Sequence, residues 1–126
     1  MRKIAQVLIG IIAALHLYIA WFEIFAWTSR GPKIFSSLPL ELFEPTTAMA
    51  ANQGLYNAFL AAGLIWALFI KDQEWSTNVA TCFLIFVGVA GIFGSITVST
   101  TILFVQTVPA AIALTLLHLA KSHDRA

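Results

Sequence analysis

One uninterrupted apolar run constrains the fold of this chain more than any other feature. Between Trp75 and Ala120 the sequence contains no Asp, Glu, Lys or Arg. As a single helix these residues would span roughly 70 Å, at about 1.5 Å per residue, or about twice the ~30 Å hydrocarbon core of a bilayer. The run therefore predicts two membrane-crossing helices joined by a short turn. We place that turn in the small and β-branched polar residues 94–101.

Two further apolar segments precede this run. The first extends from Ile4 to Trp27 with Glu23 as its only charged residue, and the second extends from Pro45 to Ile70 without a charge. Both are long enough for the ~20 residues that a membrane helix needs. We expect the first to be a membrane helix rather than a signal peptide, because it is longer than a signal core of about 7–15 residues. The sequence thus predicts four spans, at residues 4–27, 47–70, 77–96 and 101–120.

The composition also indicates that lipid surrounds the chain. Hydrophobic residues make up 60% of the 126 residues and charged residues 10%, whereas soluble domains carry about 25% charged residues. A soluble domain of this size could not bury so much apolar surface. The net charge of +1 offers no basic field for nucleic acid, and the lone Cys82 belongs to no metal-binding cluster. We predict an all-α fold: one four-helix transmembrane bundle over residues 1–126, with the lipid bilayer as partner and with no metal or cofactor.

Basic residues are distributed unequally between the two sides of such a bundle. The side with both termini carries more of them than the other, namely Arg2, Lys3, Lys71, Lys121 and Arg125 against Arg30 and Lys33. The positive-inside rule then places both termini in the cytoplasm. The mixed segment 29–48 suits an amphipathic stretch lying at the membrane interface, although an ordinary loop is the alternative.

The first predicted span contains two ionisable side chains, His16 and Glu23. Ionisable residues inside a membrane are costly, and they usually have a function or a partner. The two residues are seven apart, so they share one helix face roughly 10 Å apart along the axis, and Trp27 continues that face. We expect the carboxyl of Glu23 to be neutral or paired. Arg30, about two turns away, is a candidate partner if its side chain reaches back.

Amide and hydroxyl side chains from other spans fall at the same predicted depth. The second span opens with Asn52, Gln53, Tyr56 and Asn57, and the fourth carries Gln106 near its start. Successive spans run in opposite directions, so these residues and Glu23 all lie in the non-cytoplasmic half. We predict a polar pocket there, with Glu23 and His16 as hypothetical catalytic residues and with ligand contacts from Trp27, Asn52, Gln53, Tyr56, Asn57 and Gln106. A lone amide such as Gln106 could instead only join two helices.

Small residues predict where the helices approach one another closely. The second span carries a ridge of Gly54, Ala58 and Ala62, and the third carries Gly88, Gly91 and Gly94. In the fourth span Pro109 has no backbone N–H, so a carbonyl in the preceding turn is expected to lose its helical partner.

Several motifs of the chain resemble those of a known protein family. They are the segment 16–27 with its His, Tyr, Glu and Trp residues, the element Asn52-Gln53-Gly54-Leu55-Tyr56-Asn57, the glycines that precede Thr97, and the segment 106–110. Together they extend over nearly the whole chain, which resembles the bacterial membrane family known as domain of unknown function 1304. The resemblance implies a multi-pass protein of the bacterial cytoplasmic (inner) membrane, and it supplies no substrate.

Three functions fit a pocket of this kind. A binding module would hold a small amphiphilic ligand, such as an amine or a quinone-like or isoprenoid compound, between aromatic walls and a few polar groups. A cofactor-independent enzyme would use Glu23 and His16 as acid and base for isomerisation or epoxide opening. A proton-coupled exporter would use Glu23 and act as a homo-oligomer, because one four-helix unit is small for alternating access. A purely structural role is the remaining alternative.

Overall fold

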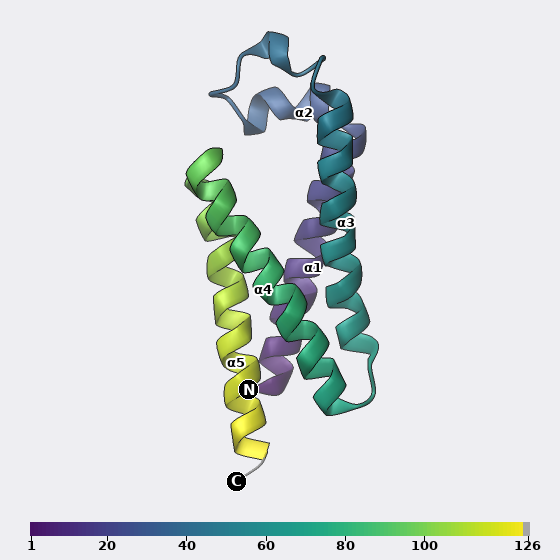
Figure 1. Cartoon of the computed structure of the whole chain (residues 1–126), viewed down its shortest axis with the longest axis vertical. Coiled ribbons are helices and arrows are strands. Elements are labelled where there is room, and N and C mark those ends of the chain that lie inside the picture. The colour runs from purple at the N-terminus through teal and green to yellow at the C-terminus, as the bar shows by residue number, and fades with distance from the viewer. Residues whose placement is uncertain (125–126) are drawn as a thin grey trace. The chain divides into compact units, whose positions relative to one another are not determined.

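The computed structural model describes residues 1–124, with side chains through Ser122, and it contains only helices and connections there. Arg125, counted above among the basic residues of the cytoplasmic side, lies outside the described residues. Figure 1 shows the helices α1 (Arg2–Phe25), α2 (Trp27–Ile34), α3 (Thr47–Phe69), α4 (Gln73–Thr97) and α5 (Val108–Asp124), with a 3-10 turn η1 (Leu40–Leu42) and a π-helical turn η2 (Leu103–Thr107). The predicted all-α fold is confirmed.

The long helical segments agree with the predicted spans to within a few residues. Among the described residues, three segments are long and apolar enough to cross a membrane: Arg2–Phe25, Gln73–Thr97 and Leu103–Ser122. Helix α3 has 23 residues, but Asn52, Gln53 and Asn57 make its first half more polar. The crossing of α3, and the four-helix bundle that depends on it, therefore stay predictions.

Internal contacts group the chain into two compact units. Residues 1–13 and 62–126 form one, which we call the α4–α5 unit, and residues 14–61 form the other, which we call the α2 unit. Helices α1 and α3 each contribute one half to either unit. The single domain over residues 1–126 stays a prediction.

The turn between α4 and α5 lies within residues 94–101, where the sequence predicted it. Helix α4 ends at Thr97, and the chain turns over residues 98–100 before the helical conformation resumes. The π-helical turn η2 comes directly before Val108 and Pro109, and the N–H of Val108 donates to the carbonyl of Leu103. Proline has no N–H and its ring crowds the preceding turn, so the wider π turn accommodates the residues before it.

Close packing between α4 and η2 depends on glycine. A Cβ built on Gly91 would collide with the hydroxyl oxygen of Thr107 and would lie 3.0 Å from the Cβ of Gln106. Thr107 also donates a hydrogen bond to the carbonyl of Gly88 at 3.0 Å. Gly91 thus admits the π turn against the helix backbone, as the small-residue spacing predicted, whereas a Cβ at Gly88 would meet no atom within 4 Å.

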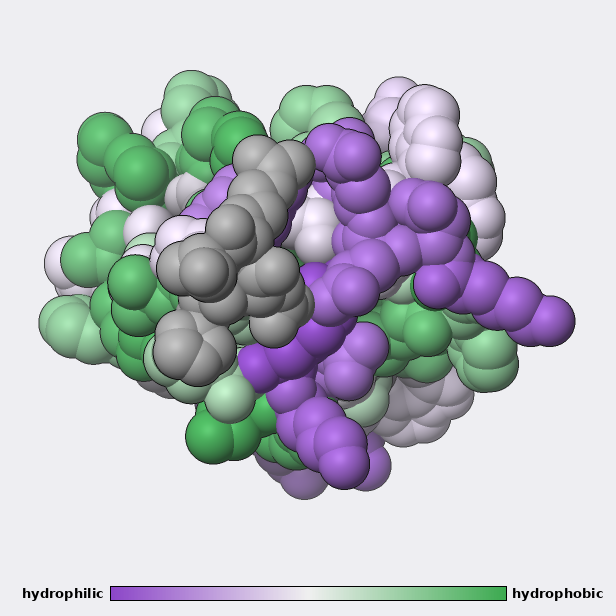
Figure 2. All heavy atoms as spheres, turned by 90° about the horizontal axis from the view of Figure 1, so that it is seen from below, coloured by the Kyte–Doolittle hydropathy of each residue, from purple (hydrophilic) through white to green (hydrophobic). Residues whose placement is uncertain are grey.

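Charged side chains gather at one end of the α4–α5 unit. Arg2 donates to the carbonyl of Gln73 at 3.0 Å, and Lys121 lies 3.8 Å from the carboxylate of Glu74. Figure 2 views this end and shows hydrophilic side chains grouped on it. The N-terminus, the start of α4 and the end of α5 therefore lie together, as the assignment of basic residues to one side assumed.

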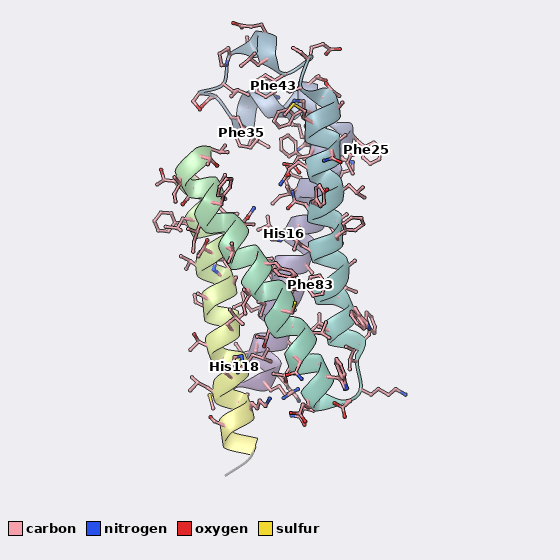
Figure 3. All side chains as sticks on the ribbon, in the orientation of Figure 1. His16, Phe25, Phe35, Phe43, Phe83 and His118 are labelled. Atoms are coloured by element: carbon pink, nitrogen blue, oxygen red, sulfur yellow. The ribbon has the colours of Figure 1, made fainter. Side chains whose placement is uncertain are left out.

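In the α2 unit, the chain after α1 is folded around an aromatic cluster, which comprises Phe22, Trp27, Phe35 and Phe43. Neighbouring rings in the cluster have centroids 5.2 to 6.2 Å apart, and Figure 3 labels Phe35 and Phe43 on this segment. Phe43 is 2% exposed. It packs on Gly31, where a Cβ would lie only 2.5 Å from the ring.

The opposite side of this segment is apolar and open. Leu40 is 71% exposed and Leu42 is 41% exposed, whereas Phe43 beside them is buried. The segment 29–48 therefore exposes large apolar side chains, which an interfacial stretch would insert into the headgroup boundary. Its position at a membrane surface stays a prediction.

Candidate functional site

The α2 unit buries a carboxylate against an amide. Glu23 on α1 is 9% exposed and Asn57 on α3 is 6% exposed. The Nδ2 group of Asn57 donates a hydrogen bond to Oε2 of Glu23 at 2.8 Å and another to the backbone carbonyl of Gln53 at 3.3 Å. Both N–H groups of the amide are thereby engaged. We call these two side chains the Glu23–Asn57 pair.

Gly54 explains how the two helices come close enough to form the pair. A Cβ at Gly54 would lie 3.0 Å from the carbonyl oxygen of Ala20, 2.8 Å from Cγ1 of Ile24 and 3.1 Å from the Cβ of Glu23. The backbone oxygen cannot move away without a shift of α1, so glycine fits where larger residues would push the helices apart. Asn57 is three residues further along α3 and shares this face. The glycine contact therefore brings Asn57 against Glu23.

The Glu23–Asn57 pair has hydrogen-bond acceptors that the chain does not use. Within residues 1–124, no donor reaches Oε1 of Glu23 or Oδ1 of Asn57. Neither oxygen is completely enclosed. Both therefore keep some accessible surface. An accessible carboxylate oxygen and an accessible amide oxygen suit a group that carries several N–H or O–H donors.

Arg30 is not the partner of Glu23 that the sequence allowed. Its NH1 group donates to the hydroxyl of Tyr18 at 3.1 Å, and its guanidinium carbon lies 5.1 Å from the centroid of the Trp21 ring. In the part of the chain that the structure describes, no Lys or Arg forms an ion pair with Glu23. The carboxylate thus has an amide, and no cation, as its partner. The sequence predicted packing or lipid contacts for Tyr18 and Trp21, and their spacing puts them on one face of α1.

His16 lies on the same face of α1 as Glu23, but the prediction that Trp27 continues this face is wrong, because α1 ends at Phe25 and Trp27 is the first residue of α2. His16 is fully buried, and Figure 3 labels it on α1. Seven residues separate it from Glu23, so the two side chains start roughly 10 Å apart along the helix axis. Trp27 belongs to the aromatic cluster, and its indole N–H donates to the hydroxyl of Thr46 at 3.0 Å. Trp27 thereby connects the start of α2 to the turn that precedes α3.

Among the described residues, no side chain of the other predicted ligand contacts forms a hydrogen bond with the Glu23–Asn57 pair. Asn52, Gln53 and Tyr56 are exposed residues of α3. Gln106 is a half-buried residue of η2 in the α4–α5 unit. Their membership of one common pocket with the pair stays a prediction. Among the described residues, no three His, Cys, Asp or Glu side chains are grouped as a metal ion would require.

These features define a class of protein: an all-helical chain with several helices apolar enough for a membrane and with a carboxylate–amide pair buried between two helices. The chain belongs to the family described as "Protein of unknown function (DUF1304)", which matches residues 10–118. It is also 27% identical over 114 residues to the uncharacterized protein YpaA of Lactococcus lactis subsp. lactis (strain IL1403), a match that covers 88% of this chain and 94% of that protein. No solved structure matches the chain significantly. The resemblance seen in the sequence motifs is confirmed.

Proposed function

We propose that this chain is a four-span protein of the bacterial cytoplasmic membrane, and that its Glu23–Asn57 pair binds the cationic head of a small amphiphilic ligand. The three long apolar helices support insertion into a membrane. Helix α3 is the fourth span, because it buries Asn57 against α1 and so lowers the cost of crossing. Both termini face the cytoplasm, in keeping with the cluster of charged residues at the end of the α4–α5 unit where the chain begins.

One observation carries the proposal: Glu23 is buried beside an amide and has no cation from residues 1–124. A buried carboxylate without a counter-charge is costly, and a bound cation removes much of that cost. An ammonium or guanidinium group also supplies several N–H donors. These donors match the two open acceptors, Oε1 of Glu23 and Oδ1 of Asn57. A protonated carboxyl is the competing explanation, and it requires no ligand.

The acid–base enzyme and the proton-coupled exporter are the competing functions. An enzyme of the kind considered above needs His16 as well as Glu23 for turnover. An exporter needs Glu23 and responds to a pH gradient across a vesicle membrane. A binding protein needs neither His16 nor a gradient, so substitution of His16 and removal of the gradient separate the three.

The experiment is native mass spectrometry of the protein extracted gently from its own membrane. It compares the wild type with Glu23→Gln, which keeps the shape of the side chain and removes its charge. The control is Glu44→Gln, which removes an exposed carboxylate of the same unit. We expect a small cationic molecule on the wild type and on the control, and its loss from Glu23→Gln. An empty wild type, or the same adduct on Glu23→Gln, would reject the proposal in favour of a structural role.

A further inference from the structure

A second polar arrangement lies on the exposed surface of the α2 unit. Tyr18 and Trp21 are each 43% exposed, and their rings lie 5.9 Å apart. The guanidinium of Arg30 lies over the Trp21 ring at 5.1 Å and donates to the Tyr18 hydroxyl at 3.1 Å. We call these three residues the Arg30 cluster. An indole face and a phenol together hold the cation in a defined place on this surface.

Most N–H groups of Arg30 have no hydrogen-bond acceptor among residues 1–124. A guanidinium has five N–H groups, and within residues 1–124 the hydroxyl of Tyr18 is the acceptor that they reach. The remaining N–H groups form a planar fork, which matches two oxygens of a phosphate or a carboxylate. The Arg30 cluster is therefore an exposed, oriented donor site whose remaining N–H groups have no acceptor among residues 1–124.

The place of the cluster on α1 indicates which anion it meets. Tyr18 and Trp21 come seven and four residues before the last residue of α1, which puts them roughly 10 and 6 Å inside the helix end. Arg30 follows that end in α2, and its side chain returns along α1 to reach them. Tyr and Trp rings are typical of the boundary between headgroups and hydrocarbon. At that depth on a lipid-facing surface, the abundant anion is the phosphate of a phospholipid.

We propose that the Arg30 cluster binds the phosphate of a phospholipid in the non-cytoplasmic leaflet. The guanidinium fork contacts the phosphate oxygens, the Trp21 ring and the Tyr18 hydroxyl fix the guanidinium, and the acyl chains lie along exposed apolar side chains of α1. This inference rests on the proposed membrane insertion. It does not depend on the Glu23–Asn57 pair or on the ligand proposed for it.

The test uses native mass spectrometry of the full chain, delipidated in detergent and titrated with phosphatidylglycerol. We expect a bound phosphatidylglycerol on the wild type, about tenfold weaker binding by Arg30→Gln and a smaller loss by Tyr18→Phe. Lys33→Gln is the matched control, because it removes another exposed cation from α2. The control should bind as the wild type does. Diacylglycerol, which lacks the phosphate, should give no adduct.

Other outcomes would overturn this inference. Unchanged binding by Arg30→Gln, or an equal loss by Lys33→Gln, would show that no defined site exists. Equal binding of diacylglycerol would assign the affinity to the acyl chains. Displacement of the lipid by excess inorganic phosphate would indicate a site for free anions, and a dimer that Arg30→Gln dissociates would assign the cluster to a second copy. Glu23→Gln should retain the lipid, so failure of this inference is distinguishable from failure of the proposed ligand site.

Discussion

The two compact units of this protein bury polar side chains very differently. In the α2 unit, His16, Glu23 and Asn57 are buried. In the described part of the α4–α5 unit, Thr77 is the buried polar residue. It lies at the charged end, where it accepts a hydrogen bond from Arg2. A scaffold does not need buried polar groups, which reduce stability unless they are fully satisfied. Under the proposed function, the α4–α5 unit provides packing and the α2 unit provides the ligand site.

Both units use glycine to bring helices together, but with different results. Gly91 admits the π turn η2 against α4, and the contact it makes is with Thr107 and Gln106. Gly54 admits α1 against α3, and this contact brings together the buried side chains of Glu23 and Asn57. Close packing alone is therefore a feature of the whole chain. The combination of close packing with an uncompensated carboxylate belongs to the α2 unit.

The largest effect that would sharpen this comparison is expected from Gly54→Ala. The added methyl group meets a backbone oxygen of α1 at 3.0 Å, and overpacking of this kind costs about 1–3 kcal/mol. We expect a lower free energy of unfolding, measured by denaturation in mixed micelles, and loss of the cationic ligand. Gly88→Ala is the control, since no atom lies within 4 Å of a Cβ there. If both substitutions have the same effect, close approach at Gly54 is not what assembles the site.

A slightly smaller effect is expected in the coupling between Glu23 and Asn57. A double-mutant cycle with Glu23→Leu and Asn57→Leu isolates the interaction at 2.8 Å, because neither leucine can form the hydrogen bond. A hydrogen bond to a charged group contributes about 1.5–3 kcal/mol, so we expect a coupling free energy of about 2 kcal/mol. The exposed pair Glu44 and Asn52 provides a control cycle in the same unit. Its coupling should be close to zero, and equal coupling in the two cycles would contradict the assignment.

Substitution of His16 separates binding from catalysis. His16→Ala removes a fully buried side chain, so we expect a lower melting temperature. The imidazole starts roughly 10 Å along the axis from Glu23, so ligand affinity should change less than about threefold, or ~0.7 kcal/mol. Loss of a catalytic turnover with retained binding would instead favour the acid–base enzyme. Calorimetric titration with the ligand identified by mass spectrometry makes the measurement.

The smallest effect is expected in the α4–α5 unit. Thr107→Val keeps the shape of the side chain and removes its hydrogen bond to the carbonyl of Gly88. Hydrogen bonds between membrane helices contribute about 0.6 kcal/mol on average, so the unfolding free energy should fall by about that much. Ligand affinity should stay at the wild-type value. A loss of binding would show that the α4–α5 unit takes part in recognition, which would break the comparison between the units.

The sequence predicted the helices well, because the length of an apolar run can be compared directly with the ~20 residues that a membrane helix needs. The turn at residues 98–100 lies where small polar residues interrupt the run, and Pro109 marked the place of the irregular turn. The kind of irregularity was not predictable, since a proline is compatible with a kink, a break or a π turn.

The site was predictable in its members but not in its contacts. Glu23 and Asn57 were both candidates, yet their hydrogen bond depends on the rotation of α3 about its axis. The expected ridge of Gly54, Ala58 and Ala62 was only partly right, because Ala62 is exposed and Ala58 half-buried. The face that packs inward carries Gly54 and Asn57. Tertiary packing selects between neighbouring faces of an apolar helix, and hydropathy alone does not.

The central claim is that the carboxylate of Glu23 recognises a cation. The most direct measurement is a calorimetric titration of the purified full chain with 3-phenylpropylammonium and with the uncharged 3-phenylpropanol, on the wild type and on Glu23→Gln. The account predicts that the wild type prefers the ammonium compound, and that Glu23→Gln loses this preference by roughly tenfold or more, because a charge-assisted hydrogen bond contributes about 1.5–3 kcal/mol. Equal affinities of the wild type and Glu23→Gln for the ammonium compound would contradict it.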